Sequence, residues 1–233
     1  MVAGCGTGQH SFETAVTHAN SSILAVDLSL SSLSYAKRKT EEYGVKNIEY
    51  LQADILDLLK LNKRFDLIES VGVLHHMKDP LEGWKILADC LRSGGLMKIG
   101  LYSELARQDI SEIRNKINDM ALSWNISDIR TFRNKIINSN KPLEKEISSR
   151  GDFFSASDLR DLLFHVQEHC FKIKEIATAL KILGLEFCGF VFQNPNIKNK
   201  FIKMHGLDNI YNLSEWDTFE QNNPKTFSAM YQF

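Results

Sequence analysis

Val2-Ala3-Gly4-Cys5-Gly6-Thr7-Gly8 is the most informative stretch of this chain. Two apolar residues lead into three glycines that alternate with other residues, and Gln9 to Asn20 then has the spacing of a short helix. Glycine allows a sharp turn between a strand and a helix, and it lets a ligand approach the backbone where a Cβ would collide. The pattern predicts the end of a strand, a glycine turn that serves as a ligand platform, and a helix.

The following strand supports a ligand site at this turn. Ile23 to Val26 is an apolar run of strand length, and Asp27 follows it directly. A carboxylate at the end of the strand after a glycine turn typically accepts hydrogen bonds from ribose hydroxyls. The glycine turn and this acid together predict a nucleoside-containing cofactor.

Strands and helices alternate along the first half of the chain. The apolar spacing predicts, in order, a helix over 29–43, a strand over 47–51, a strand over 65–71, a helix over 80–91 and a strand over 95–102. This alternation is typical of a parallel sheet with helices on both faces. From Ser103 to Leu183 the pattern is helical and charged, which predicts an insertion or lid. Strands over 185–192 and 226–233 are expected to follow.

Composition and charge are those of an ordinary globular protein. Of the 233 residues, 43% are hydrophobic and 24% charged, and 28 Lys and Arg stand against 29 Asp and Glu. This balance lacks the basic surface with which nucleic-acid binders neutralise phosphates. The sequence has no apolar run of membrane-spanning length, no signal peptide and no C-x-x-C pair among its four cysteines. We therefore expect a cytoplasmic protein without nucleic-acid or membrane partners.

Six motifs resemble those of the class I S-adenosylmethionine-dependent methyltransferases and occur in the order found in that family. They are Gly4-Cys5-Gly6-Thr7-Gly8, Ala25-Val26-Asp27-Leu28-Ser29, Gln52-Ala53-Asp54-Ile55, Phe65-Asp66-Leu67-Ile68, Val73-Leu74-His75-His76-Met77 and Leu91-Arg92-Ser93-Gly94-Gly95-Leu96. The resemblance implies an α/β fold with a Rossmann-like seven-stranded methyltransferase sheet, an antiparallel last strand and a helical insertion between strands five and six. It also implies methyl transfer with S-adenosyl-L-methionine as cofactor and S-adenosyl-L-homocysteine as product.

The resemblance also implies a cofactor site at the ends of the first three strands. The glycine turn is expected at the methionine moiety, Asp27 at the ribose and Leu28 beside the adenine, with Asp54 and Ile55 at the adenine edge. The expected cofactor-binding residues are Gly4, Cys5, Gly6, Thr7, Gly8, Gln9, Asp27, Leu28, Asp54, Ile55 and Ser70.

One position departs from the family pattern. The family usually has an acidic residue two positions before the first glycine, where this chain has Val2. The methionine amino group then needs another anchor, and we expect it among the strand-end carbonyls around Ser70.

Histidines and an acid in two places are candidates for the acceptor pocket. His75 and His76 follow the fourth strand, where an imidazole can take a proton from an acceptor O–H or N–H. His165-x-x-Glu168-His169 has the spacing of an inverted zinc-protease motif, but no third ligand is evident and the first half of the chain does not suit such an enzyme. Alternatively, residues 165–169 are a polar structural segment that packs against the sheet and has no role in catalysis. The candidate acceptor residues are His75, His165, Glu168 and His169, and we expect no metal.

Other functions share this architecture. A nicotinamide-dependent oxidoreductase expects Gly-x-Gly-x-x-Gly, whereas this chain has Gly-x-Gly-x-Gly. A non-catalytic S-adenosylmethionine- or nucleotide-binding module stays open as an alternative. Methylation of nucleic-acid bases is disfavoured because the fourth strand ends in Glu69-Ser70-Val71-Gly72 rather than an Asn-Pro-Pro-Tyr tetrad. We favour a small-molecule acceptor, since a helical lid encloses its substrate, with a protein acceptor as the alternative.

The sequence divides into three expected segments. Residues 1–102 form a cofactor-binding Rossmann-like half, 103–183 the helical insertion and 184–233 the strands that complete the sheet. Only three residues precede the glycine turn, fewer than a usual strand has, so we expect a fragment of a longer protein or a reading frame started too late. The C-terminal part, from Asp152-Phe153-Phe154 through residues 158–169 and on to the last strand, also resembles bacterial methyltransferases that occur beside tetratricopeptide-repeat domains. Such a domain is therefore a candidate neighbour in a longer parent protein.

Overall fold

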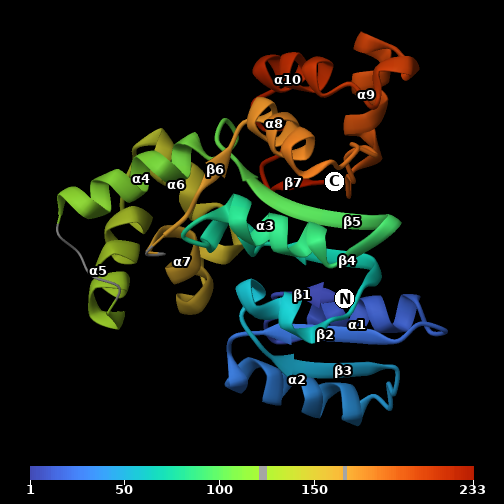
Figure 1. Cartoon of the computed structure of the whole chain (residues 1–233). Helices are drawn as coiled ribbons and strands as arrows, with labels where there is room; N and C mark the ends of the chain where they lie inside the picture. The colour runs from blue at the N-terminus through green and yellow to red at the C-terminus, as the bar shows by residue number, and fades with distance from the viewer. Residues whose placement is uncertain (121–124, 165–166) are drawn as a thin grey trace.

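The computed structural model describes residues 1–120, 125–164 and 167–233. Within these residues, seven strands form one sheet with the order β3-β2-β1-β4-β5, and both β6 and β7 pair with β5 (Figure 1). All pairs are parallel except that of β7 with β5, which is antiparallel. The predicted Rossmann-like sheet with a reversed last strand is therefore confirmed.

The first half of the chain alternates as expected. Its strands are β1 (Val2–Ala3), β2 (Ile23–Asp27), β3 (Ile48–Gln52), β4 (Phe65–Val71) and β5 (Leu91–Ser103). Its helices are α1 (Gln9–Thr17), α2 (Leu30–Glu42), η1 (Ile55–Leu61), η2 (Leu74–His76) and α3 (Pro80–Asp89). The helix starts have clear local causes, because the Ser29 hydroxyl accepts a hydrogen bond from the backbone N–H of Ser32, and Asp79 caps α3 just before Pro80.

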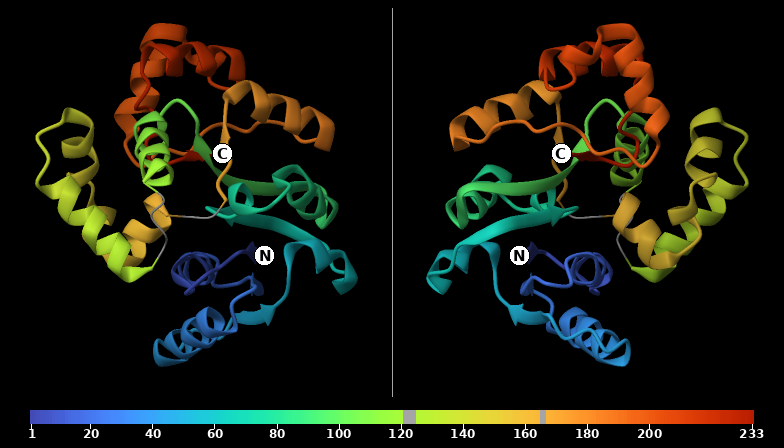
Figure 2. Two further views of the ribbon diagram at one scale, coloured as in Figure 1. Left: turned by 90° about the vertical axis from the view of Figure 1, so that its left-hand side faces the viewer. Right: turned by 90° about the vertical axis from the view of Figure 1, so that its right-hand side faces the viewer.

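The segment after β5 forms a lid with its own apolar core. Its helices are α4 (Gln108–Asp119), α5 (Ile126–Ile137), α6 (Pro142–Ser148), η3 (Gly151–Phe153) and α7 (Ala156–Leu163). Their buried side chains include Ile113, Phe132, Ile147, Phe153 and Leu159, which form a cluster separate from the core of the sheet. Figure 2 shows these helices as a group beside the sheet. The lid can therefore act as one packed body.

The C-terminal part differs from the prediction in where its strands lie. It comprises β6 (Cys170–Phe171), α8 (Ile173–Leu183), α9 (Pro195–His205), η4 (Leu207–Asn209), α10 (Leu213–Asn222) and β7 (Tyr231–Gln232). The sixth strand thus lies inside the stretch expected to be helical, and the predicted strand over 185–192 was wrong. That stretch lies beside β7, where Val191 N–H donates to the Gln232 carbonyl at 2.7 Å, and its alternating Phe190 and Phe192 pack into the core. Apolar alternation here reflects packing rather than strand pairing.

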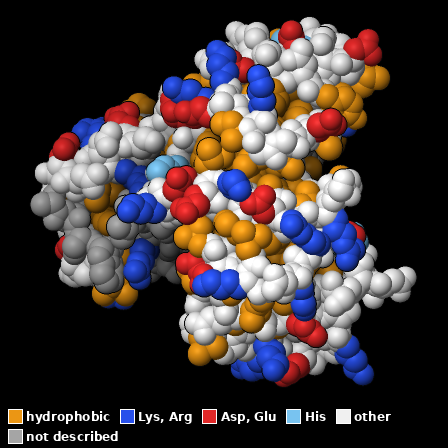
Figure 3. Space-filling model, viewed as in Figure 1, with side chains coloured by type: hydrophobic (Ala, Val, Ile, Leu, Met, Phe, Trp, Pro, Cys, Tyr) orange, Lys and Arg blue, Asp and Glu red, His pale blue; other side chains and the backbone are white. Residues whose placement is uncertain are grey.

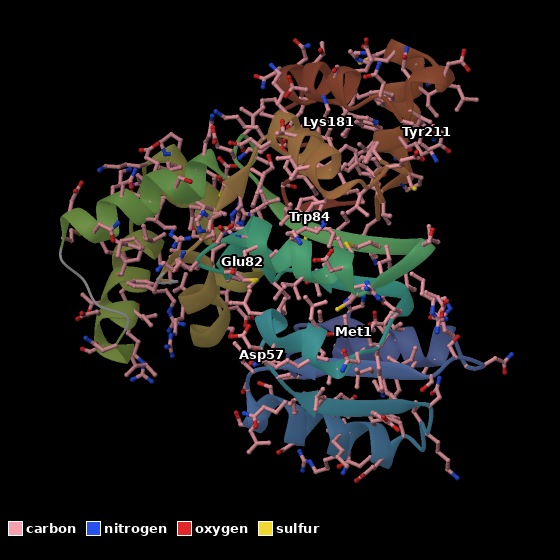
Figure 4. The ribbon with its side chains drawn as sticks, viewed as in Figure 1. Met1, Asp57, Glu82, Trp84, Lys181 and Tyr211 are labelled. Atoms are coloured by element: carbon pink, nitrogen blue, oxygen red, sulfur yellow. The ribbon has the colours of Figure 1, made fainter. Side chains whose placement is uncertain are left out.

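The main core lies between the sheet and the helices α3, α8 and α10. Trp84 of α3 is 1% exposed and lies between α3 and α8 in the view of Figure 4. In the same view Asp57 of η1 and Glu82 of α3 are on the side of the sheet that faces the lid. Within the described part of the chain, no helix is both long and apolar enough to cross a membrane.

Candidate functional site

A cavity of about 370 Å³ opens where the parallel strands β1, β2, β3 and β4 end. It is lined by Gly4, by Asp27 and Leu28 at the end of β2, by residues 54–56 after β3, and by Val73 and residues 76–78 after β4. Ligands of open α/β sheets bind in such a crevice at the carboxyl ends of strands. The cavity gathers five of the eleven residues that the sequence assigned to the cofactor, namely Gly4, Asp27, Leu28, Asp54 and Ile55.

The glycine turn combines tight packing with one open position. Gly4, Gly6 and Gly8 all have positive φ, at 77°, 53° and 92°. A Cβ on Gly4 would lie 2.3 Å from Val73, and one on Gly8 would lie 2.4 Å from the Cβ of Ala36, whereas a Cβ on Gly6 would meet nothing within 4 Å. Gly4 and Gly8 are therefore required by packing, and Gly6 leaves space in which a ligand can approach the backbone.

The Asp27 side chain stabilises the glycine turn through hydrogen bonds to the backbone. One carboxylate oxygen accepts the backbone N–H of Gly6 at 2.7 Å and the other accepts that of Ser29 at 2.9 Å. A carboxylate has about four acceptor sites, so these two bonds leave room for two hydroxyl donors. The neighbouring Leu28 side chain is 65% exposed at the cavity rim, where it offers an apolar surface to a flat ring. The pair fits a ribose with an adjacent base.

The remaining cofactor candidates lie around the cavity at different depths. Asp54 accepts the backbone N–H of Leu56 at 3.0 Å and caps η1, and Ile55 beside it is buried. Burial, followed by the nearby charge of Asp27, raises the pKa of the Cys5 thiol to about 12, so Cys5 stays protonated. The other predicted residues do not line the cavity: Cys5, Gly6, Thr7, Gly8, Gln9 and Ser70. Ser70 is fully buried, and its hydroxyl has no hydrogen-bond partner among the residues that the structure describes.

Glu69 is a functional candidate that the sequence reading missed. It lies on β4 opposite Val2 of β1, the position where the family usually has its acid. Its carboxylate accepts a hydrogen bond from the Thr14 hydroxyl at 2.6 Å and lies 3.3 Å from Nε2 of His10. An acidic residue inside the apolar run 65–71 was the available signal. Glu69 ties the helix that follows the glycine turn to the sheet.

We expect Glu69→Gln to lower the free energy of unfolding at neutral pH by about 1–3 kcal/mol. Burial would raise the pKa of Glu69, but hydrogen bonds from His10 and Thr14 outweigh it and lower that pKa from 4.5 to about 2. A depressed pKa gives stabilisation that is complete above 4.5 and is lost as the pH falls toward 2. Urea unfolding over this range checks the prediction, and equal acid sensitivity of variant and wild type would contradict it.

The acceptor candidates pack together behind the cavity wall. His75 is fully buried, its ring stacks on Tyr102 with centroids 3.9 Å apart, and its carbonyl accepts the N–H of His169 at 2.8 Å. Nε2 of His169 lies 3.2 Å from the Gln167 side-chain nitrogen, and His169 lines a different cavity between α3 and α8. His165 lies outside the described residues. Of the two adjacent histidines, His76 and not His75 lines the cavity at the strand ends.

Glu168 is held by two arginines. Its carboxylate accepts hydrogen bonds from Arg107 at 3.1 Å and lies 2.9 Å from Nη1 of Arg114, and the side chains of Glu168 and Arg107 are each 4% exposed. The Arg107 guanidinium also lies 3.6 Å from the ring centroid of Tyr102. Among the described residues, no three His, Cys, Asp or Glu side chains form a possible metal site. In this arrangement Glu168 fixes the lid to the sheet, and its expected role in the acceptor pocket stays a prediction.

Comparison with known proteins places this geometry in a family. The model of the methyltransferase domain matches residues 3–177. The chain belongs to the methyltransferase domain family. The sequence-based recognition is thus confirmed, and the family membership supports S-adenosylmethionine as the cosubstrate of this methyltransferase domain. The expected tetratricopeptide-repeat neighbour stays a prediction.

Individual relatives match the methyltransferase domain to different extents. An uncharacterized protein of Synechococcus sp. is 28% identical over 201 residues, which are 81% of this chain and 47% of that protein. A ubiquinone biosynthesis O-methyltransferase of Coxiella burnetii is 36% identical over 92 residues, 40% of this chain and 38% of that protein. PKMT2 from Rickettsia typhi, solved in complex with AdoHcy, shares the fold, with a TM-score of 0.69 and 20% identity over 99% of this chain and 46% of that one. Each of these matches thus covers less than half the length of the other protein.

Proposed function

We propose that this chain is an S-adenosylmethionine-dependent methyltransferase that acts on a small-molecule acceptor. The observation that carries the proposal is the cavity at the strand ends, which is lined by Gly4, the carboxylate of Asp27 and the exposed Leu28 side chain. The unobstructed Gly6 is tied to this site by its N–H, which donates to Asp27. These features fit a ligand with a charged chain, a ribose and a flat base. When bound, such a donor supplies an already activated sulfonium methyl group.

The contribution of the chain is positioning. Asp27 orients the ribose through its free acceptor sites, and residues 54–56 close the far end of the cavity. Val73 and Met77 form an apolar wall beside Gly4, which keeps water away from the reacting atoms. Holding the acceptor in line with the methyl group lowers the barrier by supplying orientation in advance.

A small-molecule acceptor is supported by the lid and by the surface charge. The lid has its own core, and residues 167–169, which lie between the lid helices and β6, contact the 73–77 turn on the cavity wall. A packed body in this place encloses a substrate rather than following a long one. Lys and Arg are interspersed with Asp and Glu on the face in Figure 3, so that face has no continuous basic surface for nucleic acid.

We expect Asp27→Ala to weaken binding of S-adenosylhomocysteine about 10- to 150-fold, which is the loss of charge-assisted hydrogen bonds worth about 1.5–3 kcal/mol. Calorimetric titration measures the affinity. Asp66→Ala is the matched control, because the Asp66 side chain is 80% exposed and lies outside the lining of this cavity. An unchanged affinity in Asp27→Ala would refute the site, and tighter binding of NADH than of S-adenosylhomocysteine would favour an oxidoreductase.

The acceptor class has a direct test. The chain is incubated with a methyl-labelled donor and with either a metabolite extract or a protein lysate. The proposal expects label in small molecules. Label in proteins alone would support the protein acceptor instead, and no transfer despite tight donor binding would support a non-catalytic binding module.

A further inference from the structure

We propose that the cavity between α3 and α8 binds a small organic cation, namely an amine whose apolar ring carries an oxygen at the end opposite the ammonium group. The proposal goes beyond the proposed function, because this cavity shares no lining residue with the cavity at the strand ends. It follows from the charges of the cavity lining, from its apolar walls and from one buried indole N–H.

The α3–α8 cavity has a volume of about 360 Å³, which is within the usual range for small-molecule sites. It is lined by residues 79–81 and Trp84 at α3, by residues 169–171 around β6, and by α8 from Glu175 to Ile182. The α8 positions are 175, 178, 179 and 182, which form one face of a helix. Three elements of the fold therefore enclose one site.

The lining of this cavity contains two carboxylates and, among the described residues, no lysine or arginine. One oxygen of Asp79 accepts the N–H groups at the start of α3, and one oxygen of Glu175 accepts the N–H of Lys172 at 2.8 Å. The two lysines of this region, Lys172 and Lys174, form ion pairs with other acids. Within the described chain, neither carboxylate of the cavity has a cationic partner.

The imidazole of His169 does not supply the missing cation. The side-chain nitrogen of Gln167 donates to the Met77 carbonyl at 3.3 Å and lies 3.2 Å from Nε2 of His169. An amide nitrogen donates and does not accept, so Nε2 of His169 accepts, as it does in a neutral imidazole. The carboxylates of Asp79 and Glu175 therefore set the charge of the cavity, and a cation complements it.

Trp84 lies at the bottom of the cavity. It is 1% exposed, whereas Leu81 and Ile182 of the same lining are 36% and 65% exposed. The indole nitrogen of Trp84 is buried and has no hydrogen-bond partner within the described part of the chain. An unpaired buried donor costs free energy, and an indole N–H can only donate. A ligand oxygen that reaches this nitrogen removes the cost.

These observations set the order of groups along the ligand. Its ammonium group faces Asp79 and Glu175, its ring packs on apolar side chains such as Phe171 and Ala179, and its oxygen accepts from Trp84. Tyramine has this order, because its ammonium group and its phenol oxygen are at opposite ends of one ring. Tyramine is therefore the probe.

The first experiment compares tyramine with compounds that each lack one group. Phenethylamine lacks the oxygen, 4-ethylphenol lacks the ammonium group, and 3-(4-hydroxyphenyl)propionate has the opposite charge. In calorimetric titrations of the full chain at low ionic strength, we expect one tyramine to bind. Phenethylamine should bind about 3- to 10-fold more weakly and 4-ethylphenol about two- to fivefold more weakly, as the loss of one hydrogen bond and of one exposed ion pair predicts. The propionate should not bind.

The second experiment removes the groups of the protein. In Trp84→Phe the advantage of tyramine over phenethylamine should disappear, and in Glu175→Gln its advantage over 4-ethylphenol should shrink. Glutamine keeps an oxygen for the N–H of Lys172, so α8 stays capped. The control is Glu82→Gln, because Glu82 is exposed on α3 and does not line the cavity, and it should change neither ratio.

The indole N–H resonance of Trp84 in the ¹⁵N-labelled wild type gives a test that needs no variant. Tyramine should shift this resonance, and phenethylamine should shift it less. An unmoved resonance, or equal affinities for tyramine and the propionate, overturns the proposal. Loss of tyramine affinity in Asp27→Ala would place the amine in the cavity at the strand ends and would also overturn it.

Discussion

Glu168→Ala is expected to lower the free energy of unfolding by about 3–5 kcal/mol, as is typical when one partner of a buried ion pair is removed. The carboxylate is the shared partner of Arg107 and Arg114, and Arg107 is 4% exposed. Without Glu168, two guanidinium groups face each other with little water to solvate them. The lid loses a buried polar attachment to the sheet, so both stability and donor affinity should fall.

Chemical denaturation measures the loss of stability in Glu168→Ala, and two control variants show whether it comes from the buried ion pair. Asp89→Ala breaks the exposed pair with Lys85, whose side chains are 44% and 65% exposed, and should change stability by less than about 0.5 kcal/mol. Arg107→Ala combined with Glu168→Ala should cost less than the sum of the single variants, because the double variant removes both members of the pair. A Glu168→Ala variant as stable as Asp89→Ala would show that the ion pair does not hold the lid.

The first half of the fold was predictable because its signals are local. Glycine turns, apolar runs of strand length and helix caps lie within a few residues of one another, and β2 ends at Asp27 as expected. The sixth strand was not predictable, because Cys170–Phe171 is too short for its periodicity to differ from that of a helix. The alternating aromatic residues of 185–192 have strand-like spacing but pack into the core.

The candidate site was likewise predictable where its signals are local and not where it depends on contacts between distant residues. Asp27, Leu28, Asp54 and Ile55 line the cavity because each lies at or just beyond the end of a parallel strand, and parallel strands end at the same edge of a sheet. Which of two adjacent histidines reaches that cavity depends on the direction of a single 3-10 turn, and no sequence pattern encodes it. The pairing of Glu168 with Arg107 joins residues far apart in the chain. Contacts of that kind become visible only in three dimensions.

Gly8→Ala is expected to lower the free energy of unfolding by about 3–5 kcal/mol, whereas Gly6→Ala should cost only about 1–2 kcal/mol. Both residues have positive φ, so both substitutions carry the strain of a left-handed alanine. The two positions differ in the room they leave for a methyl group. A Cβ on Gly8 would lie 2.4 Å from the Cβ and 3.1 Å from the Cα of Ala36, whereas a Cβ on Gly6 would meet no atom within 4 Å. Helix α2 must shift to accept Gly8→Ala.

Gly6→Ala should lower the affinity for S-adenosylhomocysteine strongly although it lowers the free energy of unfolding less than Gly8→Ala does. The Cβ of Gly6→Ala would occupy the open space beside the N–H that Asp27 accepts, where the donor is expected to approach the backbone. A methyl group there displaces the ligand although the fold is nearly intact. We therefore expect Gly6→Ala to lose S-adenosylhomocysteine affinity at least tenfold, equivalent to about 1.4 kcal/mol, with only the small loss of stability. Wild-type affinity in a folded Gly6→Ala variant would mean that the ligand does not contact the turn at Gly6.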